Sequence, residues 1–127
     1  MFISRSLINL RLTIHSKKRL KERAGIDTKK KRIEFLKEFS RNGLRFSEIP
    51  KESKFIAFKN YMKKYIKKSK FKDPFCTVYL FRRFFIIVSL TGFIITILNI
   101  EPKEYKNIYN DILQKEYSLS RSFNIWM

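Results

Sequence analysis

The chain has little cysteine and histidine, and this shortage excludes several kinds of site. One of its 127 residues is cysteine, Cys76, and one is histidine, His15. A single cysteine cannot form an internal disulfide, so the fold does not depend on an oxidising compartment, and we expect a cytoplasmic protein. One cysteine and one histidine cannot supply the ligands of a zinc site. We therefore expect no metal and no other cofactor, and any nuclease chemistry should be metal-independent.

Acidic residues are also few. The 29 Lys and Arg residues outnumber the 11 Asp and Glu residues and give a formal net charge of +18 at pH 7. This excess is larger than solubility requires, and it repels itself in an isolated monomer. We therefore expect a polyanionic partner, which is nucleic acid, anionic lipid headgroups or an acidic protein. The charge is concentrated, because residues 16–72 hold 21 of the Lys and Arg residues and 6 of the Asp and Glu residues.

Long apolar runs are missing as well. The most apolar segment, residues 84–100, has 17 residues and follows Arg82 and Arg83. It falls short of the roughly 20 residues that span a bilayer. The segment is rich in β-branched Ile and Val, which favour strands. It predicts two buried strands, with a transmembrane helix as the alternative, and a membrane partner is not expected.

The remaining pattern predicts one α+β domain over residues 1–127, in which basic N-terminal helices pack on a small antiparallel β-meander. The basic helical part covers residues 15–70. We expect helices over 15–24 before Gly25, from Asp27 or Thr28 to Asn42-Gly43, and over 52–68. The meander, residues 76–100, should contain strands near 76–81, 84–89 and 93–100. An amphipathic C-terminal helix over 102–117 should have Pro102 at its first position.

The N-terminal segment, residues 1–14, has two interpretations. Ile8, Leu10, Leu12 and Ile14 alternate with polar residues, which predicts a first strand. The segment also contains Arg and Ser and has no acidic residue before Glu22, which is typical of a mitochondrial presequence. In that case the protein would act in the mitochondrial matrix.

One stretch carries the residues best suited to chemistry. On a helix, His15, Arg19 and Arg23 recur every four residues and project from one stripe. A guanidinium matches phosphate with two hydrogen bonds, and an imidazole titrates near neutral pH and can take a proton from a ribose 2′-hydroxyl. The pattern predicts a metal-independent ribonuclease site, with Arg82 stabilising developing charge. The alternative interpretation is that His15 is a solvated surface residue.

Further cations are candidates for RNA contacts without chemistry. They lie on the expected basic helices and at the turn between the first two strands of the meander. Tyr79 and Phe81 could stack on bases, but aromatic residues in a small sheet are more often core residues. The predicted RNA-binding residues are Lys17, Lys18, Lys21, Lys29, Lys30, Lys31, Arg32, Lys63, Lys64, Lys67, Lys68 and Arg83.

Thr13, His15, Arg19, Arg23 and Gly25 form the order T-x-H-x3-R-x3-R-x-G. It is followed by a basic helix ending at Gly43, a loop with Ser47, a helix with F-K-N-Y-M and a closing strand pair ending FIITILNIEP. This order resembles a family of small uncharacterised proteins of phages and mobile elements. That family is similar to ribonuclease toxin domains of the RelE and barnase type, in which helices pack on an antiparallel sheet. The similarity covers roughly residues 12–102. Family members often have a second histidine where this chain has Phe46, so the resemblance implies RNA contact more firmly than RNA cleavage.

Two functions lead at this point, and a third, a membrane-associated basic protein, depends only on residues 84–100. One is a toxin-type, metal-independent endoribonuclease, with an acidic antitoxin protein as a further partner. The other is a noncatalytic protein that binds RNA or a ribonucleoprotein, such as a phage-encoded inhibitor of a host RNA-guided or ribosomal complex, or an organellar ribosomal protein.

Overall fold

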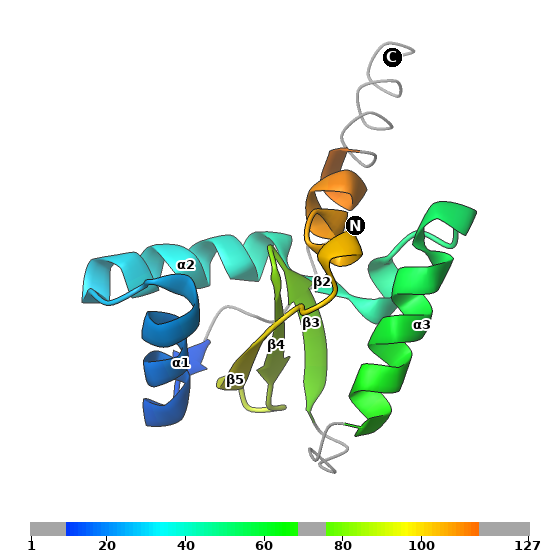
Figure 1. Ribbon diagram of the computed structural model, residues 1–127. Coiled ribbons are helices and arrows are strands. Elements are labelled where there is room, and N and C mark those ends of the chain that lie inside the picture. Colours follow the sequence, from blue (N-terminus) through cyan, green and yellow to red (C-terminus); the bar gives the residue numbers. More distant parts are fainter. Residues whose placement is uncertain (1–9, 69–75, 115–127) are drawn as a thin grey trace, which may run out of the picture.

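A computed structural model describes residues 10–68 and 76–114, and it shows an α+β fold. A mixed five-stranded sheet has the order β1-β5-β4-β3-β2. Figure 1 shows α1 and α2 on one side of this sheet and α3 on the other. The elements are β1 (Arg11–Leu12), α1 (Ile14–Ala24), α2 (Lys29–Asn42), β2 (Leu44–Arg45), η1 (Phe46–Glu48), α3 (Ser53–Lys68), β3 (Thr77–Phe81), β4 (Phe84–Val88), β5 (Phe93–Asn99) and η2 (Lys103–Tyr105).

The predicted meander is confirmed. β3 pairs with β4 and β4 with β5, both antiparallel, and β4 lies at the centre of the sheet, as its continuous apolar sequence requires. The segment 84–100 thus forms strands. Among the described residues, no helix is both long enough and apolar enough to cross a membrane.

Two short strands, β1 and β2, form the edges of the sheet. The sequence did not predict that the sheet has these edge strands. β2 pairs antiparallel with β3, whereas β1 pairs in parallel with β5, which makes the sheet mixed. Each has two residues, too few for an alternating pattern. The expected strand through Ile14 is wrong beyond Leu12, because Thr13 caps α1 and leaves Ile14 89% exposed.

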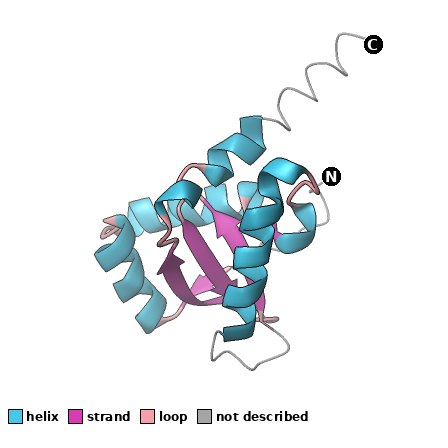
Figure 2. Ribbon diagram, turned by 45° about the vertical axis from the view of Figure 1, so that its right-hand side comes forward, coloured by secondary structure: helices cyan, strands magenta, loops and turns pink. Residues whose placement is uncertain are grey.

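The helices cover both faces of the sheet. Phe39 of α2 packs edge-on against Tyr79 of β3, with ring centroids 5.4 Å apart. Phe58 of α3 stacks on Phe85 of β4 at 6.1 Å. Phe81 pairs with Phe84, the neighbour of Phe85, so the rings of Phe81 and Phe85 lie on opposite faces. Figure 2 shows α3 in front of the sheet.

The C-terminal helix begins later than predicted. Pro102 precedes the short 3-10 helix η2, and residues 108–114 are α-helical. Tyr105 contacts Phe58 on one side of the sheet, whereas Tyr109 contacts Phe81 on the other. Residues four apart on a continuous helix lie on the same stripe, so the helix must be interrupted between them. The predicted apolar stripe is confirmed for Ile108, Tyr109 and Ile112, which are buried, but it is wrong for Tyr105, which lies in η2.

Some predictions lie outside the described residues. They concern a strand or presequence in residues 1–9, the helix over 115–117, and the side chains of Lys67 and Lys68.

Gly43 provides a test of how tightly α2 ends against the core. A Cβ atom at Gly43 would lie 2.5 Å from Cε1 of the fully buried Phe39, whereas a Cβ at Gly25 would meet nothing within 4 Å. We expect Gly43→Ala to lower the free energy of unfolding by about 1–3 kcal/mol, because the ring has no space to move. Gly25→Ala should cost about 1 kcal/mol, through its positive φ alone. Urea unfolding measures both, and a smaller loss for Gly43→Ala than for Gly25→Ala would contradict the packing.

Candidate functional site

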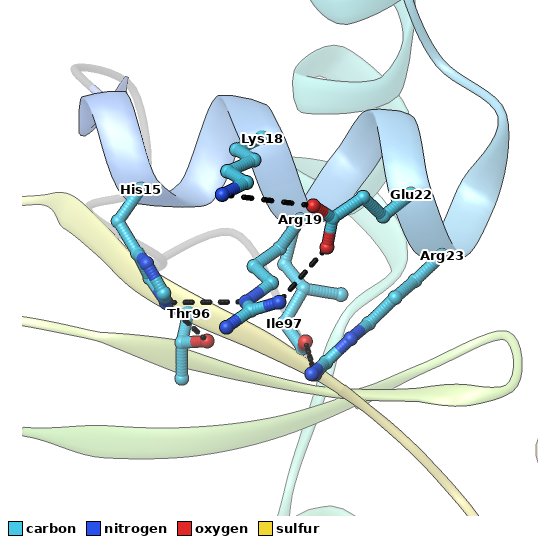
Figure 3. A network of polar contacts seen from close by, with 7 residues as sticks. All are labelled: His15, Lys18, Arg19, Glu22, Arg23, Thr96 and Ile97. Carbon is cyan, nitrogen blue, oxygen red and sulfur yellow. Dashed lines mark hydrogen bonds and ion pairs between the residues drawn. The ribbon is translucent and has the colours of Figure 1, made fainter.

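The helix α1 forms as its sequence predicts and lies along β5. The Thr13 hydroxyl accepts a hydrogen bond from the Ser16 backbone N–H at 3.0 Å, and Gly25 ends the helix in the left-handed conformation with φ 68°. The buried face of the helix carries Leu20, which is 0% exposed. Figure 3 shows His15, Arg19 and Arg23 in a row above β5, which confirms that they share a stripe.

His15 lies at the start of this row and already has partners within the protein. Arg19 Nε donates to His15 Nε2 at 3.4 Å, and the hydroxyl of Thr96 is 3.5 Å from the same nitrogen. Arg19 also pairs with Glu22 at 2.8 Å (Figure 3). Because an arginine Nε can only donate, His15 Nε2 must offer its lone pair to Arg19. The nitrogen that a general base would use is therefore engaged.

Arg23, at the other end of the row, supports the edge of the sheet. Its guanidinium donates to the backbone carbonyl oxygen of Ile97 in β5 (Figure 3). The hydroxyl of Thr13 likewise donates to the carbonyl oxygen of Ile94 at 3.2 Å. Strand edges carry unpaired backbone groups, and here side chains of α1 and its cap satisfy two of them.

A cavity of about 540 Å³ opens beside Arg23, at the end of the sheet. Arg82 and Arg83 reach it from the β3–β4 turn, and Lys106 reaches it from the segment after η2. Four cations from three separate parts of the chain thus surround one hollow, which we call the basic cavity. It is lined by Arg23, Ala24, Arg82, Arg83, Phe84, Asn99, Ile100, Glu101 and Lys106.

Arg82 is held firmly at the wall of the basic cavity. It has a φ of 55°, which is unusual for a residue with a side chain and follows from its place in the two-residue turn. Its guanidinium pairs with Glu38 of α2 and lies over the rings of Phe35 and Phe81, at 5.5 and 4.9 Å from their centroids. Arg82 is nevertheless exposed to solvent, as are Arg83 and Lys106.

The structure therefore divides the predicted catalytic residues into two groups. Arg23 and Arg82 line the basic cavity together with Arg83, whereas His15 and Arg19 are not among the described residues that line it. His15 and Arg23 are eight residues apart on α1, which corresponds to about 12 Å along the helix axis.

The other predicted RNA-binding residues lie on both sides of the sheet. On α1 and α2, Lys18 and Lys21 approach Glu22 and Asp27 at 4.0 Å, and Arg32 donates to the Asp27 carbonyl. Tyr79 and Phe81 are buried, which confirms that they are core residues. The other predicted RNA-binding residues with exposed side chains are Lys17, Lys18, Lys21, Lys29, Lys30 and Lys31 on α1 and α2, and Lys63 and Lys64 on α3.

Besides the apolar Ala24 and Ile100, sequence reasoning missed four residues that line the basic cavity: Phe84, Asn99, Glu101 and Lys106. They belong to strand ends and to the segment after β5, and only the closing of the meander brings them to the C-terminal end of α1. The one available signal was the position of Asn99 and Glu101 at the end of an apolar strand. Among the described residues, no group of three His, Cys, Asp or Glu side chains could hold a metal ion.

Comparison with known proteins gives no assignment: no family model matches the chain, and neither the curated proteins nor the solved structures yield a match.

Two tyrosines beside the basic cavity provide a pH test of its geometry. Burial raises the pKa of Tyr61 above its ordinary value of 10.0, and the Glu101 carboxylate adds to this increase, while a hydrogen bond from the Glu101 backbone opposes it. Burial also raises the pKa of Tyr65, an effect that the charge of Arg23 opposes. Groups with a raised pKa contribute stability that is fully present below pH 10 and is lost as the pH rises through the pKa of the folded state.

We expect the folded protein to contain tyrosines that ionise above pH 10, visible in the ultraviolet absorbance of tyrosinate. Tyr61→Phe should remove one of these late steps and should reduce the loss of unfolding free energy between pH 9 and pH 11. The packing around Glu101 is contradicted if the step that disappears lies at or below pH 10.

Proposed function

We propose that the protein binds RNA and that the basic cavity holds one of its phosphate groups. The observation that carries this proposal is the convergence of Arg23, Arg82, Arg83 and Lys106 on one hollow. Glu38 already offsets the charge of Arg82. Like charges brought together repel one another, and an anion in the hollow would offset those of Arg23, Arg83 and Lys106. Guanidinium groups match phosphate oxygens in geometry as well as in charge.

The surroundings of the basic cavity favour a long polyanion over a single small anion. Exposed lysines lie along both α1, whose last residues line the cavity, and α2, which lies on the same side of the sheet in Figure 1. The whole chain has a net charge of +18, which a single phosphate leaves almost unchanged. A nucleic acid carries one charge per nucleotide and so can reach the cavity and the helices together.

Glu101 supports RNA over DNA as the partner. It is the one carboxylate among the described lining residues of the basic cavity. An ionised carboxylate only accepts hydrogen bonds, so it repels phosphate and suits a donor such as the ribose 2′-hydroxyl, which DNA lacks. The motif around His15 resembles a phage and mobile-element family that is itself similar to ribonuclease toxin domains, and this resemblance implies the same partner.

RNA cleavage by His15 is the alternative that the sequence left open. Its proposed base, His15, accepts a hydrogen bond from Arg19 and lies about 12 Å along α1 from Arg23. The geometry thus favours binding without cleavage by His15, which includes binding to a ribonucleoprotein. An acidic protein partner would bind the same exposed cations. Such a partner would therefore compete with RNA for the protein.

Charge variants of the basic cavity test the binding. We expect Arg83→Ala/Lys106→Ala to weaken the affinity for a short single-stranded RNA about tenfold or more and to make its dependence on salt less steep, because phosphate contacts are lost. The control Lys51→Ala/Lys54→Ala removes the same charge from exposed residues near the start of α3. Fluorescence anisotropy at several salt concentrations measures both. Equal losses for the two double variants would contradict a phosphate site in the cavity.

His15 variants test the chemistry. In the presence of EDTA, we expect the protein to leave labelled RNA intact and His15→Ala to bind RNA with an affinity within about twofold of the unaltered chain, since surface contacts are worth little. Gel analysis of the RNA after incubation gives the result. Cleavage by the unaltered protein that disappears in His15→Ala would instead establish the endoribonuclease.

A further inference from the structure

The basic cavity contains more than cations. Phe84 begins β4 and Asn99 ends β5, and the two are directly paired across the strands. Side chains at paired positions lie next to each other on the same face of a sheet. An aromatic ring and a carboxamide therefore line the same hollow as Arg83 and Lys106. Phe84 is half-buried and Asn99 is exposed, so the amide is open to a ligand.

We propose that the basic cavity takes one unpaired nucleotide of a single-stranded RNA. In this arrangement the base lies against the ring of Phe84, the amide of Asn99 bonds to the edge of the base, and the phosphate lies among the cations. The inference rests on the RNA binding proposed above and adds to it which form of RNA is bound.

The size and chemistry of the basic cavity fit this ligand. Its volume of about 540 Å³ falls within the range of pockets that hold small organic ligands. Aromatic rings bind bases by stacking, which suits any base because each has a π-face. A carboxamide both donates and accepts hydrogen bonds, as the edges of bases do. In a duplex, the faces of a base are stacked and its edge is paired, so both features require an unpaired nucleotide.

The alternative is a purely electrostatic surface, and it makes the opposite prediction. Duplexes carry a higher density of phosphate charge than single strands, so attraction to charge alone favours the duplex. A preference for the single strand therefore requires contacts with unpaired bases.

The test compares a fluorescein-labelled single-stranded RNA of about ten nucleotides with the blunt duplex of the same sequence. We expect the full chain to bind the single strand at least about tenfold more tightly. Phe84→Leu, which keeps an apolar side chain, and Asn99→Ala should each reduce this preference by about fivefold or more. The matched control is Phe93→Leu, at the other end of β5, where Phe93 is 36% exposed; it should bind as the unaltered chain does.

A second measurement does not depend on the stability of any variant. In a single strand that contains 2-aminopurine, stacking on Phe84 should change the fluorescence of that base when the unaltered protein binds. Equal or tighter binding of the duplex, together with no change in 2-aminopurine fluorescence, would overturn the inference. The double variant Arg83→Ala/Lys106→Ala then separates the two proposals. If it still weakens the affinity for both RNAs, RNA binding at the basic cavity stands and only the nucleotide site is wrong. If its affinity for both RNAs is unchanged, the proposed function is wrong as well.

Discussion

The contact between α1 and the edge of β5 determines the rest of the arrangement. β1 pairs with β5 at two positions only, and Thr13 and Arg23 donate to the carbonyl oxygens of Ile94 and Ile97 in the same strand. A highly basic helix is thereby attached along an apolar sheet. Its last turn lies beside the β3–β4 turn and the segment after β5, so that cations far apart in the sequence meet around one hollow. Without this contact the edge of β5 would be exposed, and the cations would not be gathered around one cavity.

Most of the fold could be predicted from the sequence, because its signals are local. Gly25 and Gly43 end α1 and α2, Thr28 caps α2, and the apolar runs around Arg82 and Gly92 give the meander. The parts that were wrong depend on tertiary contacts. The two-residue edge strands are too short to leave a pattern, and the late start of the C-terminal helix follows from Tyr105 and Tyr109 packing on different sides of the sheet.

The candidate site was less predictable for the same reason. Helical spacing correctly placed His15, Arg19 and Arg23 on one stripe. Spacing along one helix could not show that Arg23 lies with Arg82 and Arg83 in a cavity while His15 pairs with Arg19 and Thr96. Nor could it show that Phe84 and Asn99, paired across two strands, face the same hollow. A site built from strand ends becomes visible only when the register and the covering helix are known.

The central claim is that the position of the cations, more than their number, decides where RNA binds. The most direct measurement is a titration of the isotope-labelled protein with a short single-stranded RNA, followed through the backbone amide signals in nuclear magnetic resonance. Shifts concentrated at Arg83, Phe84, Asn99, Glu101 and Lys106 are the predicted result. Shifts spread evenly over the exposed lysines of α1, α2 and α3, with the basic cavity unaffected, would contradict the account.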